Sequence, residues 1–135
     1  MAALMLAVTF AVVASAQEKK SVWSGVYTDA QADRGVAVYK AKCTFCHGDS
    51  LRGAIDGGPP LRGLEFTLRW NGIALSDMVD QIAQQMPFEK PNTLKRQEYV
   101  DILTFLFRAN GIPAGTTELT TDPAALSSVE FFAEK

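Results

Sequence analysis

Both cysteines of the chain and its single histidine stand within five consecutive positions, Cys43-Thr44-Phe45-Cys46-His47. This spacing suits covalent haem attachment, a dithiol redox pair or part of a metal site. A redox dithiol normally follows a β-strand in a βαβ unit, and no strand pattern precedes Cys43. A structural zinc site needs four ligands, and these three residues are the only Cys and His that the chain has. Covalent haem is therefore favoured, with both thiols added to the haem vinyl groups and His47 as the proximal iron ligand.

The other axial position of such a haem needs a second ligand. Bis-histidine ligation within one chain is excluded because no second histidine exists. Downstream of the apolar N-terminal run, only Met78 and Met86 offer a thioether. Met78 falls in the apolar stripe of an expected helix, where a methionine usually fills the core. Pro87 restricts Met86 to extended backbone on a stiff corner, so we predict Met86 as the distal ligand.

The elements that must position these ligands are predicted to be helices joined by long loops. The spacing of apolar residues predicts helices from residue 29 into the cysteine pair, over residues 65–70, 76–85 and 94–110, and from residue 123 in the tail. The expected N-caps are Thr28, with Gln31 completing a capping box, Ser76, Asn92 or Thr93, and Asp122 followed by Pro123. No period-two run of β-branched residues occurs downstream of residue 27, which predicts an all-α fold without a sheet.

One long segment has no helical pattern. Between Asp49 and Gly63 the sequence turns to Gly, Pro and small residues, DSLRGAIDGGPPLRG. Such a loop is uncommon in a compact domain unless it serves a function. Few apolar side chains lie outside the last long helix, so we expect a thin protein core. A large apolar cofactor, wrapped by this loop, would fill it.

The N-terminal residues resemble an export signal. Residues 2–13 are apolar and uncharged, and they end in Ala14-Ser15-Ala16. We therefore predict a signal peptide over 1–16, a leader over 17–27 and a periplasmic protein, which agrees with haem attachment after export. No Lys or Arg precedes the apolar run, unlike a standard signal peptide, and the segment contacts a membrane only if it stays uncleaved.

The charge of the chain argues against a nucleic-acid partner. The sequence has 13 Lys and Arg against 15 Asp and Glu, for a formal net charge of −2. The basic residues are scattered, so no basic stripe exists that would neutralise a phosphate backbone.

On these residues the sequence resembles the class I c-type cytochromes, which are small exported monohaem electron carriers. The resemblance covers residues 28–111. Gly35 and Tyr39 match the small and aromatic positions where the first helix of the family crosses its last helix. Ile102 and Phe105 match the apolar positions on the other side of that crossing.

Two loop motifs extend the resemblance. The segment GPPL, which holds Pro59 and Leu61, resembles a family loop in which the Pro carbonyl accepts the Nδ1 proton of the haem histidine. The segment QMPFEKP resembles the Met-Pro segment of the family, with Met86 in the ligand position. Residues 23–35 are more loosely similar to bacterial cytochromes found beside quinoprotein dehydrogenases.

Further haem contacts are expected from side chains near these loops. Arg62 and Trp70 are candidate donors to the haem propionates, because a buried carboxylate needs hydrogen-bond partners. A plain core aromatic remains the alternative for Trp70. The apolar side chains expected on the haem face are Phe45, Leu61, Leu64 and Phe66.

The resemblance implies a small cytochrome c fold, in which the N- and C-terminal helices cross around one covalently bound haem c. The cytochrome domain would span 28–112, followed by a C-terminal extension over 113–135. The implied function is one-electron transfer, without enzymatic activity, between a quinoprotein dehydrogenase or quinol-oxidising complex and an acceptor such as a terminal oxidase. Two alternatives stay open: a peroxidase-like haem enzyme whose Met86 dissociates, and a subunit held permanently on a dehydrogenase.

Overall fold

The computed structural model describes residues 19–54 and 57–135, so the predicted signal peptide over 1–16 lies outside the described residues. The elements in chain order are β1 (Lys20–Ser21), η1 (Val22–Ser24), α1 (Asp29–Lys42), α2 (Thr44–His47), α3 (Leu64–Trp70), β2 (Ile73–Ala74), α4 (Leu75–Gln85), α5 (Arg96–Ala109), α6 (Pro123–Ser127) and β3 (Val129–Phe131). None of the helices in these two ranges has the length and apolar character needed to cross a bilayer.

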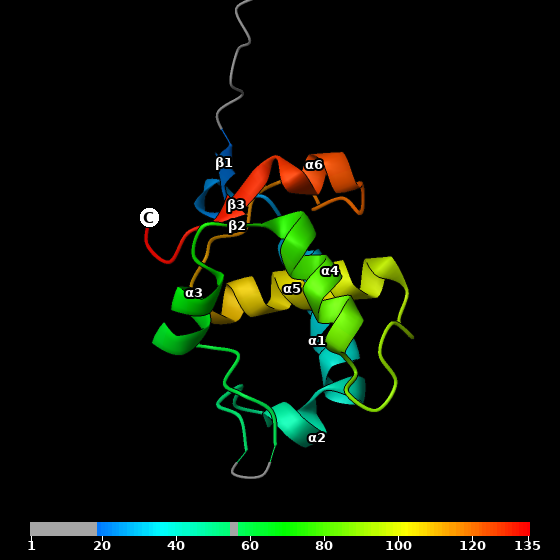
Figure 1. Ribbon diagram of the computed structural model, residues 1–135. Helices are drawn as coiled ribbons and strands as arrows, with labels where there is room; N and C mark the ends of the chain where they lie inside the picture. Colours follow the sequence, from blue (N-terminus) through cyan, green and yellow to red (C-terminus); the bar gives the residue numbers. More distant parts are fainter. Residues whose placement is uncertain (1–18, 55–56) are drawn as a thin grey trace, which may run out of the picture.

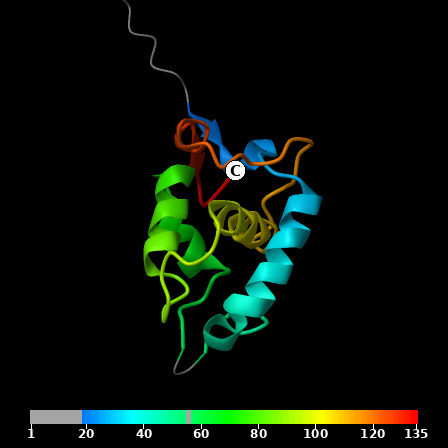
Figure 2. The ribbon, with the colours of Figure 1, turned by 90° about the vertical axis from the view of Figure 1, so that its right-hand side faces the viewer.

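The centre of the fold is the crossing of α1 and α5. Figures 1 and 2 show α5 running through the middle of the molecule with α1 laid across it. A Cβ atom at Gly35 would lie 2.0 Å from the carbonyl oxygen of Asp101, so only glycine allows this approach. Beside it, the rings of Tyr39 and Phe105 pack with centroids 5.2 Å apart. The expected crossing residues thus lie at the contact between the two helices.

The caps of α1 and α6 follow the sequence prediction. The Thr28 hydroxyl accepts a hydrogen bond from the Gln31 amide at 3.2 Å, and Asp122 caps α6 through the Ala125 amide at 2.8 Å. The Gln31 side chain does not complete a capping box. Its amide donates to the Leu119 carbonyl and accepts from the Leu119 amide, at 2.8 and 2.7 Å, which fastens the C-terminal extension to α1.

The starts of α4 and α5 differ from the prediction. The N-cap of α4 is Ala74, and Ser76 lies inside the helix, where its hydroxyl accepts a hydrogen bond from Ser127 at 3.0 Å. The N-cap of α5 is Lys95, whose amide donates to the Glu98 side chain at 2.7 Å. In both cases a tertiary or local hydrogen bond outweighs the capping preference of a nearby Ser, Asn or Thr.

The expectation of a fold without a sheet is wrong. β3 lies between the other two strands, parallel to β1 and antiparallel to β2. The register pairs Lys20 with Val129 and Ile73 with Phe131. Each strand has only two or three residues, too few to show a period-two pattern, so the pairing depends on the fold bringing the strands together.

The leader and the C-terminal extension supply part of the core. Their buried side chains are Val22, Tyr27, Leu119, Leu126, Val129 and Phe131. The Phe131 ring packs edge-on against Phe66 of α3 at 5.9 Å and also lies 5.8 Å from the Phe107 ring of α5. The buried core therefore includes more side chains outside α5 than the sequence predicted.

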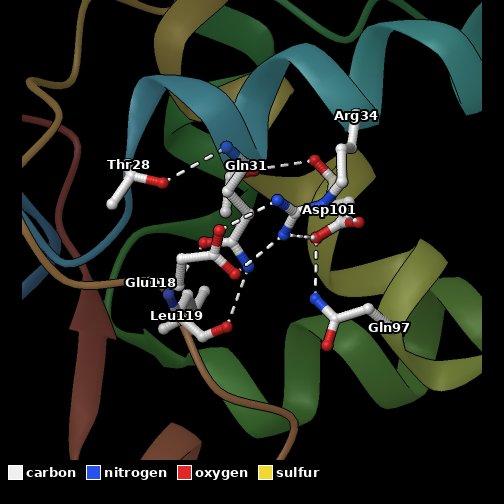
Figure 3. A network of polar contacts seen from close by, with 8 residues as sticks. Thr28, Gln31, Arg34, Gln97, Asp101, Glu118 and Leu119 are labelled. Carbon is white, nitrogen blue, oxygen red and sulfur yellow. Dashed lines mark hydrogen bonds and ion pairs between the residues drawn. The ribbon is translucent and has the colours of Figure 1, made fainter.

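A polar network holds the extension on the helix crossing (Figure 3). Arg34 of α1 donates to the side chain of Asp101 at 3.1 Å and to that of Glu118 at 2.8 Å. The Asp101 carboxylate is 5% exposed and also accepts a hydrogen bond from Gln97 at 2.7 Å, so this buried charge is paired. The Arg34 guanidinium also holds the pKa of Glu118 below its usual range.

Replacement of Gly35 by Ala should weaken the helix crossing. The added Cβ would overlap the Asp101 carbonyl group. Overpacking of this kind costs up to about 3 kcal/mol, whereas the gain in helix propensity is about 1 kcal/mol. We expect urea unfolding, followed by circular dichroism, to show a loss of about 2 kcal/mol. The exposed control Ala37→Ser on the same helix should change stability by at most about 0.5 kcal/mol.

Candidate functional site

A largely apolar cavity of about 340 Å³ lies between the C-terminal end of α1, α2, the 57–63 loop, α3, α4 and α5. Its volume falls in the range of roughly 300–1,000 Å³ that ligand sites occupy. The predicted site residues that line it are Cys43, Cys46, His47, Pro59, Leu61, Trp70 and Met86. The fold therefore brings the Cys-x-x-Cys-His motif and the distant methionine to one cavity.

Histidine 47 is held by the loop that follows it. The side chain is 5% exposed, and its Nδ1 lies 2.9 Å from the carbonyl oxygen of Pro59. Because a carbonyl oxygen only accepts, this contact assigns the proton to Nδ1 and leaves the Nε2 lone pair available as a metal ligand. A Cβ at Gly58 would lie 2.3 Å from Cε1 of the ring, so glycine is needed beside the imidazole.

Backbone hydrogen bonds attach the long loop to α2. The amides of Gly53 and Gly58 donate to the carbonyls of His47 and Cys46, at 3.0 and 2.8 Å. The Tyr39 hydroxyl donates to the Gly48 carbonyl at 2.7 Å. Burial raises the pKa of Tyr39 to about 12, so the phenol stays protonated and remains a donor. The expected ordered loop is thus built around the motif.

The environment of the Cys43 thiol differs from that of an activated redox cysteine. Neither Cys43 nor Cys46 is in a disulfide. Burial, followed by the charge of Cys46, raises the pKa of the Cys43 thiol to about 11. The attacking thiol of a dithiol oxidoreductase has a lowered pKa, so the environment of Cys43 does not suit it to that role. Across residues 19–54 and 57–135, no group of three or more His, Cys, Asp or Glu side chains is placed to hold a metal ion.

The methionine side of the cavity follows the end of α4. Met86 has φ −129° and ψ 150°, the extended backbone expected before Pro87, and its half-buried side chain lines the cavity. Met78 is completely buried in the core. The Tyr99 hydroxyl of α5 donates to the Met86 carbonyl at 2.8 Å. No local sequence signal indicated this contact.

Three side chains expected near the haem are not part of the described cavity wall. Phe45 and Leu64 were expected on the haem face, but both are exposed and neither is part of the described cavity wall. Phe45 stands two residues before His47 in one helical turn, which directs it away from the imidazole. Arg62 is exposed and is not part of the described cavity wall.

The residues that do line the α3 side of the cavity include two aromatic side chains and one cation. Phe66 and Trp70 are both buried on α3. Arg69, which the sequence did not single out, also lines the cavity, and its guanidinium carbon lies 5.5 Å from the centre of the Trp70 ring. The donor set of two thiols, one imidazole and one thioether inside apolar walls therefore fits a haem.

Comparison with known proteins decides the family. The family model described as "Cytochrome C oxidase, cbb3-type, subunit III" matches residues 30–106, more than half of the chain. The chain belongs to this family of c-type cytochrome domains. It is a class I c-type cytochrome. Members of this family bind haem c covalently and transfer electrons.

One solved structure has a similar fold. A chain of the sulfane dehydrogenase SoxCD from Paracoccus pantotrophus matches with a TM-score of 0.51 and 26% sequence identity. The match covers 67% of this cytochrome and 52% of that chain, so the cytochrome spans about half the length of its structural neighbour. No curated protein sequence matches it.

Proposed function

We propose that this cytochrome is a periplasmic one-electron carrier with one haem c, bound through Cys43 and Cys46 and ligated by His47 and Met86. The observation that carries the proposal is an apolar cavity whose wall includes both cysteines, the histidine and the methionine. When bound, the haem supplies an iron that cycles between the ferrous and ferric states.

Backbone and side-chain groups around the cavity would set the ligands and the reduction potential of that iron. The Pro59 carbonyl fixes the His47 tautomer and so leaves Nε2 for the metal. A thioether from Met86 would raise the reduction potential and would occupy the position that a substrate needs on the iron. Arg69 and Trp70 line the cavity, and we propose both as propionate donors together with the predicted Arg62.

Export to the periplasm remains part of the proposal. It rests on the apolar run and small-residue site within residues 1–16. It also rests on the family, because covalent haem attachment to the Cys-x-x-Cys-His motif follows export.

A permanently bound dehydrogenase subunit is the second candidate function. The structural neighbour belongs to a sulfane dehydrogenase, and this likeness supports a dehydrogenase as the electron donor. A shuttle needs only a weak, short-lived interface, whereas a subunit needs a large apolar one.

Substitution of the motif cysteines tests the cofactor. The wild-type protein, denatured in alkaline pyridine, should give the haem c spectrum with about one haem for each chain. The Cys43→Ala/Cys46→Ala variant should lose all covalent haem, because no thiol is left to add to the vinyl groups. Haem that stays attached to the denatured double variant would contradict the proposal.

Substitution of the two methionines tests the distal ligand. Wild-type protein should be low-spin in both redox states. Met86→Ala should become high-spin or bind an external ligand, and its potential should fall by a fraction of the roughly 0.8 V that axial ligands span. Met78→Ala, the matched control, should keep the wild-type spectrum and lose about 2–5 kcal/mol of stability. A high-spin wild-type protein would favour a peroxidase-like enzyme instead.

Size-exclusion chromatography distinguishes a free electron carrier from a permanently bound dehydrogenase subunit. A carrier should elute at the mass of a single chain, both alone and after mixing with its candidate dehydrogenase at micromolar concentration, because a weak complex dissociates on the column. Elution together with the dehydrogenase would assign the chain as a subunit. Electron transfer assayed in the same mixture identifies a productive donor in either case.

A further inference from the structure

The segment that carries Met86 is weakly attached to the rest of the protein. It connects α4 to α5, and residues 88–93 are exposed. The hydrogen bond from the Lys90 amide to the Pro87 carbonyl, at 2.9 Å, lies within the segment. The Asn92 amide donates to the Ala83 carbonyl of α4 at 2.8 Å, so this bond ties the segment back to the helix that precedes it.

Tyr99 links both ends of this segment to the core. The side chain is 2% exposed and lines the cavity from α5. Its hydroxyl donates to the Met86 carbonyl at 2.8 Å and accepts from the Leu94 amide at 3.4 Å. One buried phenol therefore uses both its donor and its acceptor on the segment.

We propose that Tyr99 is a positioning residue for the distal ligand, an inference that rests on the proposed function of Met86. A hydrogen bond to the carbonyl of Met86 restrains the backbone from which the thioether projects. Restraint before ligation lowers the entropy lost when the thioether binds the iron. A neutral thioether is a weak ligand, so a segment held in place competes better with external ligands for the same position.

The phenylalanine variant separates positioning from packing. Tyr99→Phe keeps the ring and removes only the hydroxyl, which leaves the Met86 carbonyl without its buried partner. Tyr27→Phe is the matched control. The Tyr27 ring is completely buried, its hydroxyl donates to the Ile112 carbonyl at 2.6 Å, and it is not part of the described cavity wall.

The readout is the binding of imidazole to the ferric holo-protein, which displaces the methionine. Tyr99→Phe should bind imidazole more tightly by on the order of tenfold, as expected for the loss of one hydrogen bond that favours the ligated form. Tyr27→Phe should stay within about twofold of the wild type, although both variants lose stability toward urea. Unchanged affinity in Tyr99→Phe, or an equal increase in both variants, would overturn the role of Tyr99.

A second measurement needs no variant. In the ferrous wild-type protein, the hydroxyl proton of Tyr99 should exchange slowly with solvent and show nuclear Overhauser contacts to the Met86–Pro87 segment. Rapid exchange without these contacts would overturn the role of Tyr99 alone. A wild-type ferric protein that lacks the sulfur-to-iron charge-transfer band would instead reject Met86 as ligand, and with it both proposals.

Discussion

The contact between α1 and α5 at Gly35 sets the geometry of the whole site. Because no side chain separates the helices there, the Asp101 backbone lies directly against α1. The C-terminal end of α1 leads into Cys43 and His47, and the opposite helix contributes Ile102 to the cavity wall. The two helices therefore fix how far the cysteine motif lies from the remaining walls. Any displacement of α1 relative to α5 at the crossing would therefore change the shape of the cavity.

Helix α5 also serves as the anchor for the loops on both sides of the cavity. Near its start, the Tyr99 hydroxyl holds the Met86 carbonyl. At its end, Asn110 donates to the Leu61 carbonyl at 3.0 Å and accepts from the Gly63 amide at 2.8 Å. Loops with few apolar side chains gain order from such bonds, because unpaired polar groups at the cavity wall would be costly to bury. The site is thus attached to a rigid element through side-chain bonds to loop backbone.

The leader and the C-terminal extension complete the fold from the side away from the motif. Gln31 and Arg34 of α1 bind the extension through Leu119 and Glu118, and the three-stranded sheet joins the extension to the leader. Phe131 of the extension then packs behind Phe66, which itself lines the cavity. The segments outside the predicted 28–112 domain therefore support the cavity wall.

Residue types and short-range patterns were enough to predict the class of this protein, a c-type cytochrome domain. The Cys-x-x-Cys-His spacing, the restriction of Met86 by Pro87 and the caps at Thr28 and Asp122 depend on neighbouring residues, and the scarcity of other ligands is read from the composition. Only the tertiary structure decided the sheet, the hydrogen bond from Tyr99 to the Met86 carbonyl and the place of Arg69 in the cavity wall. The strands are too short for a pattern to show, and a side chain's hydrogen-bond partner depends on which distant backbone the fold places beside it.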